Sequence, residues 1–174
     1  MFAKIRDNLF ITDYQIPHEI DFIKENHITA VLNVAFEVND PEYIPTAVRA
    51  VKIFLGDYGD NKPYMKEIAI DTLVKMLQNK EVVIVHCNAG MSRSVYVTCH
   101  TLARIEKKLP MDVFKEVITQ HPFALVGPLW EADETLKKDI IERLTAESAK
   151  GKRVLSESTN SGPSPDAATK AVIV

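Results

Sequence analysis

The sequence predicts an α/β fold, a single domain in which a central mixed β-sheet is flanked by helices. The main observation is the run Val82-Val83-Ile84-Val85, which is wholly apolar and β-branched and is therefore typical of a central strand covered on both faces. After it, apolar residues recur at helical spacing from Val95 to Ile105. The length of 174 residues and the hydrophobic content of 46% are enough for one domain with a sizeable core.

Four further strands are predicted to accompany that central run. Residues 2–5 and 9–11 are apolar stretches separated by a polar turn, which is typical of two short strands. Residues 28–34 form a second buried strand. After an irregular connection marked by prolines, residues 47–54 form another.

Five helices are predicted from apolar spacings of three and four and from prolines suited to a first helical turn. Two of them begin at Pro17 and Pro63, and the others cover residues 94–108, 112–119 and 129–144. Strands and helices therefore alternate along the chain, which favours a sheet with crossover helices.

The end of the chain differs in composition. Residues 156–169 contain no aromatic or large aliphatic side chain, so this stretch has too little apolar surface to order itself. We expect one globular domain over residues 1–146 and a flexible tail over residues 147–174.

The junction between the central strand and the next helix carries the chemistry. A helix N-terminus has unpaired N–H groups and partial positive charge, so a loop above it can bind a phosphate-like anion. In that field Cys87 is favoured as the nucleophilic thiolate, and Arg93 supplies a planar fork for two anion oxygens. Gly90 permits a close backbone approach. The expected phosphate-binding residues are Asn88, Ala89, Gly90, Met91, Ser92 and Arg93.

Three polar residues are predicted to support this loop. Ser94 is placed to donate a hydrogen bond to the Cys87 thiolate, and His86 to orient the loop from behind. Asn33 lies at the end of a buried strand, where it either braces the phosphate loop or satisfies a turn. The sequence leaves both roles of Asn33 open.

The pattern His86-Cys87, five residues, Arg93-Ser94 resembles the signature of the protein tyrosine phosphatase superfamily. The loop sequence His-Cys-Asn-Ala-Gly-Met-Ser-Arg-Ser is most similar to that of its dual-specificity branch. The resemblance covers about residues 1–146. It implies a protein tyrosine phosphatase-like fold and phosphomonoester hydrolysis through a phosphocysteine, without a cofactor or a metal. A rhodanese-like phosphatase fold stays open on the loop alone.

The same resemblance places a general acid on the loop after residues 47–54. Aligning Ile53-Phe54-Leu55-Gly56-Asp57 with the family's apolar strand followed by Asp selects Asp57, with Asp60 in reserve. A phosphoester's departing oxygen leaves slowly unless it is protonated, so turnover requires such an acid. The chain departs from the family at Pro128-Leu129-Trp130, where many members have Asn after the proline and a later Gln.

Alternative functions remain at this point. The loop has neither the Lys of phosphoinositide-directed relatives nor the Thr after Arg93 of RNA triphosphatase relatives, which favours a phosphorylated protein as substrate. A binding module that recognises phosphorylated partners without turnover is the competing class. A zinc site from His86, Cys87, Cys99 and His100 is disfavoured because neighbours on a strand face opposite sides. Core packing is the expected role of Cys99.

Composition limits the classes of partner and the cellular compartment that we expect for this protein. A formal charge of −3 gives no basic footprint for nucleic acid. Two cysteines, one of them assigned as a nucleophile, favour a reducing compartment and a cytoplasmic location. The sequence shows neither a signal-peptide core nor a membrane-spanning segment, and it does not predict the oligomeric state.

Overall fold

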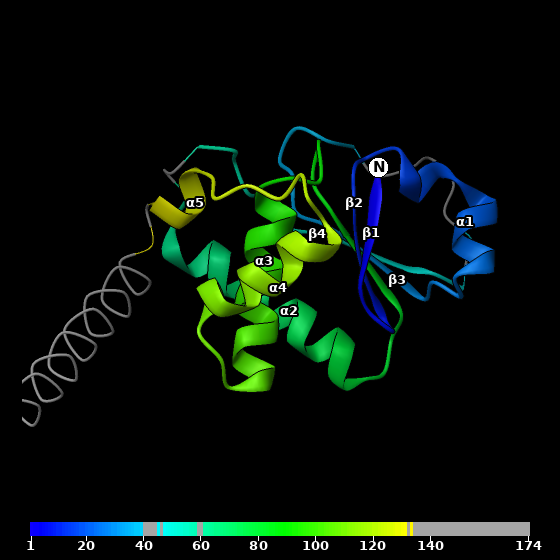
Figure 1. Cartoon of the computed structure of the whole chain (residues 1–174). Coiled ribbons are helices and arrows are strands. Elements are labelled where there is room, and N and C mark those ends of the chain that lie inside the picture. The colour runs from blue at the N-terminus through cyan, green and yellow to red at the C-terminus, as the bar shows by residue number, and fades with distance from the viewer. Residues whose placement is uncertain (40–44, 46, 59–60, 132, 134–174) are drawn as a thin grey trace, which may run out of the picture. The chain divides into compact units, whose positions relative to one another are not determined.

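A computed structural model of the protein describes residues 1–39, 45, 47–58, 61–131 and 133. Within these residues the strands form one five-stranded sheet in the order β1-β2-β5-β3-β4 (Figure 1). The strands are β1 Phe2–Arg6, β2 Leu9–Thr12, β3 Ala30–Asn33, β4 Arg49–Lys52 and β5 Val83–His86. β5 lies at the centre, as its wholly apolar sequence predicts.

The sheet is mixed, which confirms the predicted class. β1 pairs with β2 in antiparallel orientation across the Asp7-Asn8 turn. β2, β5, β3 and β4 are parallel to one another. Because parallel strands end at the same edge, the segments that follow β2, β3 and β5 lie close together there.

Two apolar clusters cover the two faces of the sheet. Alternate residues of each strand point to opposite faces, so Leu9 and Ile11 join the larger cluster while Phe10 joins the smaller one. On β5, Val83 and Val85 belong to the larger cluster and Ile84 to the smaller. Burial of each such side chain contributes about 1.5–3 kcal/mol relative to exposure.

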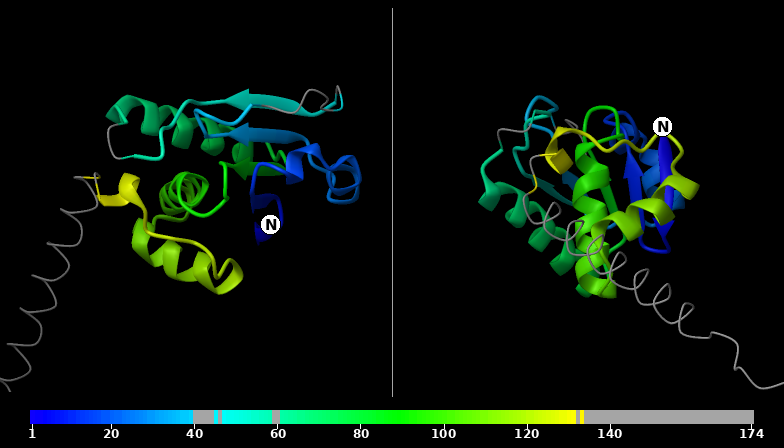
Figure 2. Two further views of the ribbon diagram at one scale, coloured as in Figure 1. Left: turned by 90° about the horizontal axis from the view of Figure 1, so that it is seen from above. Right: turned by 60° about the vertical axis from the view of Figure 1, so that its left-hand side comes forward.

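The helices divide between these faces. The 3-10 helix η1 Ile16–His18 and α1 Ile20–Glu25 supply Ile16 and Ile23 to the smaller cluster. The larger cluster is closed by α2 Pro63–Gln78, α3 Arg93–Glu106, α4 Pro110–Gln120 and α5 Pro128–Glu131. Two further views show α1 on one side of the sheet and α2, α3 and α4 on the other (Figure 2).

Several element boundaries differ from the prediction. The helical segment expected from Pro17 is confirmed, but it is divided, because Glu19 is extended (φ −86°, ψ 94°) and separates η1 from α1. β3 and β4 are shorter than the runs 28–34 and 47–54, although the ladder continues by one bond, Ile53 N to Asn33 O at 2.8 Å.

The C-terminal predictions are only partly covered. α5 confirms a helix start near Leu129, and most of the predicted helix 129–144 lies outside the described residues. The domain boundary at 146 and the tail 147–174 also lie outside them and stay predictions. No helix in the described ranges is long and apolar enough to cross a membrane.

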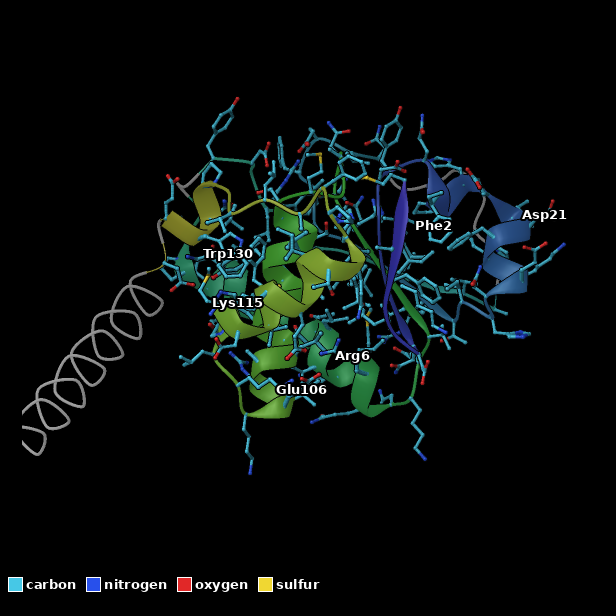
Figure 3. The ribbon with its side chains drawn as sticks, in the orientation of Figure 1. Phe2, Arg6, Asp21, Glu106, Lys115 and Trp130 are labelled. Carbon is cyan, nitrogen blue, oxygen red and sulfur yellow. The ribbon has the colours of Figure 1, made fainter. Side chains whose placement is uncertain are left out.

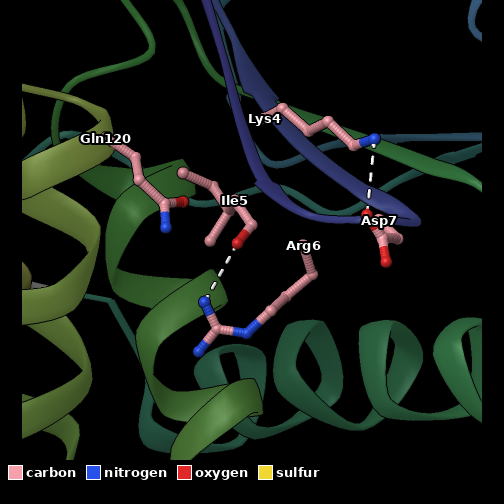
Figure 4. A pocket seen from close by; sticks show the side chains of 5 residues that line it. All are labelled: Lys4, Ile5, Arg6, Asp7 and Gln120. Carbon is pink, nitrogen blue, oxygen red and sulfur yellow. Dashed lines mark hydrogen bonds and ion pairs between the residues drawn. The ribbon is translucent and has the colours of Figure 1, made fainter.

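Arg6 joins the edge strand to two helices. Its guanidinium bonds to Glu106 of α3 at 3.0 Å and to Glu116 of α4 at 2.9 Å, and Figure 3 shows Arg6 directed at Glu106. A hollow of about 340 Å³ lies beside it, lined by Lys4, Ile5, Arg6, Asp7 and Gln120 (Figure 4). Arg6 pairs with Leu9, which is level with the start of β5, so this hollow is at the opposite end of the strands from Cys87.

Candidate active site

The loop of residues 87–92 joins the end of β5 to the start of α3. It opens onto a hollow of about 190 Å³, which we call the Cys87 hollow. Its lining is Asp57, Cys87, Asn88, Ala89, Met91, Ser92, Arg93 and Leu125. The structure thus brings most of the predicted site residues together and adds Leu125, from the segment after α4. Cys87 is only 2% exposed, so small reactants must reach its sulfur through this hollow.

Cys87 and Ser94 lie in contact. The sulfur is 3.4 Å from the Ser94 hydroxyl oxygen, and Ser94 is fully buried in the first turn of α3. When Cys87 is a thiolate only the hydroxyl can donate this hydrogen bond. The free N–H groups at the start of this 14-residue helix favour negative charge at the same place.

Main-chain contacts hold the outer side of the loop. The Tyr14 N–H donates to the Asn88 carbonyl at 3.0 Å, and the Leu125 N–H donates to the Met91 carbonyl at 2.8 Å. A peptide unit is planar and trans, so a carbonyl held outward sets the next residue's N–H in the opposite direction. Those two N–H groups belong to Ala89 and Ser92, which line the Cys87 hollow. The N–H groups of Ala89 and Ser92 therefore point away from the two outer contacts.

Gly90 is required at its position. Its φ is +71°, and a Cβ would lie 2.6 Å from the Thr12 carbonyl oxygen and 2.9 Å from the Asp13 nitrogen. No other residue fits without moving this backbone. On the other side the Gly90 carbonyl accepts from His121 Nε2 at 2.8 Å.

Arg93 is buried, with 2% exposure, and most of its donors are engaged. Nη1 and Nη2 bond to the two carboxylate oxygens of Glu37 at 2.6 and 2.5 Å, and Nη1 also donates to the Leu55 carbonyl at 3.1 Å. Asp57 Oδ1 is 3.1 Å from Nε. Burial opposes the charge on Arg93, but Glu37, Cys87 and Asp57 outweigh it and hold the pKa of Arg93 above its usual value.

Asp57 lies next to Arg93 at the Cys87 hollow. Its carboxylate faces the Nε edge of Arg93, and its side chain is more than half exposed. Asn61 shapes this loop by accepting from the Gly56 N–H at 2.7 Å and donating to the Tyr58 carbonyl at 2.8 Å. Asp60 lies outside the described residues, so the choice between the two acids stays a prediction.

The supporting residues contact the loop and a neighbouring turn. His86 Nδ1 lies 3.2 Å from the Cys87 carbonyl oxygen. The Asn33 amide donates to the Val38 carbonyl and its oxygen accepts from the Ala35 N–H, both at 2.9 Å. These bonds match the turn-satisfying role of Asn33, and that turn carries Glu37.

Sequence reasoning missed Glu37, His121 and Leu125. Glu37 is one of three acids between residues 37 and 42, where charged residues are usually solvated, and only the tertiary fold brings it to Arg93. His121 stands before Pro122, and nothing in its sequence neighbours indicates a role at the site. The pairing of the 121–127 segment with the phosphate loop has no local sequence signal.

Cys99 is buried like Cys87, but it does not line the Cys87 hollow. It is fully buried in the larger cluster, and this burial raises the pKa of its thiol well above the usual range. The core-packing prediction for Cys99 is confirmed. Among the residues that the structure describes, no group of three or more His, Cys, Asp or Glu is arranged to hold a metal ion.

Comparison with known proteins agrees with this geometry. The family model for the dual specificity phosphatase catalytic domain matches residues 9–118. A comparison with curated protein sequences finds no significant match.

Solved structures share the fold at low identity. Human DUSP28 is 16% identical with a TM-score of 0.68, and the match covers 80% of this chain and 94% of that one. A mouse putative dual specificity phosphatase complexed with zinc tungstate is 20% identical with a TM-score of 0.67, covering 80% and 91%. PTPMT1 in complex with PI(5)P is 15% identical with a TM-score of 0.65, covering 82% and 98%.

Proposed function

This chain belongs to the dual specificity phosphatase family, and we propose that it hydrolyses phosphotyrosine and phosphoserine or phosphothreonine on proteins through a phosphocysteine intermediate. The observation that carries the proposal is the meeting of Cys87, Arg93 and Asp57 in one hollow. A nucleophile, an anion fork and an acid at one place are the parts that phosphoryl transfer requires.

In the first step the Cys87 thiolate attacks phosphorus. The new S–P bond forms as the bond from phosphorus to the ester oxygen breaks, and Asp57 gives its proton to that oxygen. Arg93 and the loop N–H groups hold the non-bridging oxygens, on which charge is concentrated in the transition state. Asp57 now lies 3.1 Å from Arg93 Nε, so a phosphoryl oxygen takes this place and Asp57 moves toward the ester oxygen.

In the second step water cleaves the S–P bond. Asp57, now a carboxylate, accepts a proton from the water, and phosphate leaves with the oxygen of that water. The sulfur departs as a thiolate, and the Ser94 hydroxyl at 3.4 Å stabilises it. Asp57 therefore acts as an acid in the first step and as a base in the second. Ser94 stabilises the Cys87 thiolate both before the attack and when the sulfur departs.

A phosphorylated protein is the proposed substrate because the loop between Cys87 and Arg93 carries no Lys, and an inositol headgroup brings further phosphates that need cations. The solved structure of PTPMT1 with PI(5)P makes that lipid the alternative to test. We also propose a cytoplasmic site of action, since a thiolate nucleophile needs a reducing compartment.

The test is turnover of an aryl phosphate together with phosphotyrosine and phosphothreonine peptides, PI(5)P and an RNA 5'-triphosphate, with reductant and a chelator present. We expect turnover of the aryl phosphate and of both peptides. Cys87→Ser should abolish turnover and keep vanadate binding, whereas Cys99→Ser, at the buried cysteine, should remain active. Faster turnover of PI(5)P or RNA would reassign the substrate, and peptide binding without turnover would make the chain a binding module.

A further inference from the structure

We infer that His121 is a positioning residue for catalysis, which locks the Gly90-Met91 peptide so that the Met91 N–H faces the phosphoryl oxygens. This inference rests on the proposed function. It starts from the contact of His121 Nε2 with the Gly90 carbonyl oxygen at 2.8 Å, made by a side chain that is 2% exposed.

The direction of one peptide bond decides what this contact does. A carbonyl and the following N–H point in opposite directions, so holding the Gly90 oxygen toward His121 sets the Met91 N–H away from it. Met91 lines the Cys87 hollow. The Met91 N–H therefore joins the donors set by Tyr14 and Leu125 at the neighbouring carbonyls.

The Gly90-Met91 peptide needs an external contact to fix its orientation more than the neighbouring peptides do. A glycine can adopt backbone angles closed to other residues, so rotation of the peptide after Gly90 meets a low steric barrier. A rotated peptide would direct a carbonyl oxygen at the anion and repel it. Gly90 cannot be replaced to stiffen the loop, because a Cβ would lie 2.6 Å from the Thr12 oxygen.

The lock is a side chain, which makes it testable. The main chain around His121 is held separately from its side chain. The His121 N–H donates to the Val117 carbonyl at 2.8 Å, and the His121 carbonyl accepts from the Ala124 N–H at 2.9 Å. A substitution at 121 therefore removes the bond to Gly90 while the end of α4 keeps its main-chain bonds. The contact requires a hydrogen on Nε2, since a bare nitrogen would repel the carbonyl oxygen.

Two substitutions separate donation from packing. His121→Gln keeps an N–H donor about where Nε2 lies, and His121→Leu keeps much of the volume without a donor. Val113→Ala is the matched control: Val113 is fully buried on α4, the helix that ends just before His121, and lies outside the Cys87 hollow. It should lower the melting temperature and leave the kinetics of the folded enzyme unchanged.

The measurements are kcat/KM for an aryl phosphate, the vanadate inhibition constant, vanadate binding by calorimetry, and the rate of Cys87 alkylation by iodoacetamide at one pH. Loss of a direct oxyanion donor lowers kcat about a hundredfold to a thousandfold. His121 acts only through the Met91 N–H, so His121→Leu should lower kcat/KM by less, roughly tenfold to a hundredfold, with a similar loss of vanadate affinity. Alkylation of Cys87 should be slower in this variant. His121→Gln should stay close to wild type in all four.

Wild-type vanadate affinity in His121→Leu, with only a lower melting temperature, would reduce His121 to a structural residue. So would a Gln variant as impaired as the Leu variant. If the wild-type protein turned over no phosphate ester, the proposed function would fail, yet vanadate binding and Cys87 alkylation would still decide the role of His121.

Discussion

Arg93 and Glu37 form a bidentate pair, with Nη1 and Nη2 at 2.6 and 2.5 Å from the two carboxylate oxygens. The pair takes one edge of the guanidinium and leaves the Nε edge toward Asp57 and the Cys87 hollow. Its hydrogen bonds also hold the pKa of Glu37 below the usual value, against the opposing effect of burial. Arg93 is therefore oriented before any substrate arrives, so that binding need not order it.

Glu37→Ala should lower kcat/KM roughly a hundredfold, because a misplaced clamp loses alignment with the transition state. Glu37→Gln, which retains one acceptor and the shape, should lose less. The matched control is Glu81→Ala, since Glu81 makes a similar two-bond pair with Arg49, at 3.2 and 2.6 Å, on the other end of the sheet. Steady-state kinetics with an aryl phosphate measure the effect, and equal losses in the two Ala variants would refute the orienting role of Glu37.

Ser94→Ala should slow the second step more than the first. Without the hydroxyl at 3.4 Å the sulfur is a poorer leaving group, so the phosphocysteine accumulates and a burst of the phenol product precedes slow turnover. Thr98→Val is the control, because Thr98 is buried one turn further along α3 and its hydroxyl has no hydrogen-bond partner in the described residues. Rapid-quench kinetics with an aryl phosphate should show a burst in Ser94→Ala only.

The fold was predictable where the signal is local. The apolar run of β5 and the helical spacing of α3 predict the junction that carries Cys87 and Arg93, and both elements formed as expected. Glu19 was not predictable as a break, because its neighbours continue a helical pattern and only its backbone angles separate η1 from α1.

The site was predictable only in part, for a similar reason. The motif identifies Arg93 as a fork, yet its partner Glu37 reaches it through a turn whose shape depends on bonds from Asn33. His121 reaches Gly90 only because α4 packs on α3 and the segment after α4 contacts the loop. Both contacts join segments far apart in the sequence, which no local spacing encodes.

Asp57→Asn should lower kcat/KM, and the loss should grow with the basicity of the leaving group. General acid catalysis raises the reaction rate about a hundredfold to ten-thousandfold, and an acidic phenol leaves without it. We therefore expect a large loss with alkyl phosphates and a small one with p-nitrophenyl phosphate. Asp60→Asn, measured on the same series, is the comparison; a deficit that rises with leaving-group basicity in that variant instead would transfer the acid role to Asp60.

His100 links stability to pH. Its ring lies 4.2 Å from that of Tyr96 and 5.3 Å from that of Trp130, and Nε2 is 3.6 Å from an Asp133 oxygen. Burial lowers the pKa of His100 from 6.5 to about 4, although Asp133 acts in the opposite direction. The other charged groups acting on it are Lys66, Glu67 and Arg104.

The sign of the effect follows from proton binding. Below pH 6.5 the unfolded chain protonates His100, whereas the folded protein resists protonation down to about pH 4. Stability from this residue is therefore present above pH 6.5 and is lost as the pH falls to about 4, with a total of about 3 kcal/mol at most.

Urea unfolding of wild type and His100→Phe at several pH values between 7 and 4 measures this loss as a change in the free energy of unfolding. Carboxylates with lowered pKa values, such as Glu37 and Glu106, lose stability at the acid end in both proteins, so the difference between the two curves isolates His100. That difference should grow as the pH falls, because only the wild type has a buried imidazole to protonate. His18→Gln, at an exposed histidine, should follow the wild-type curve. Parallel curves for wild type and His100→Phe would show that His100 protonates equally easily in the folded and unfolded chains.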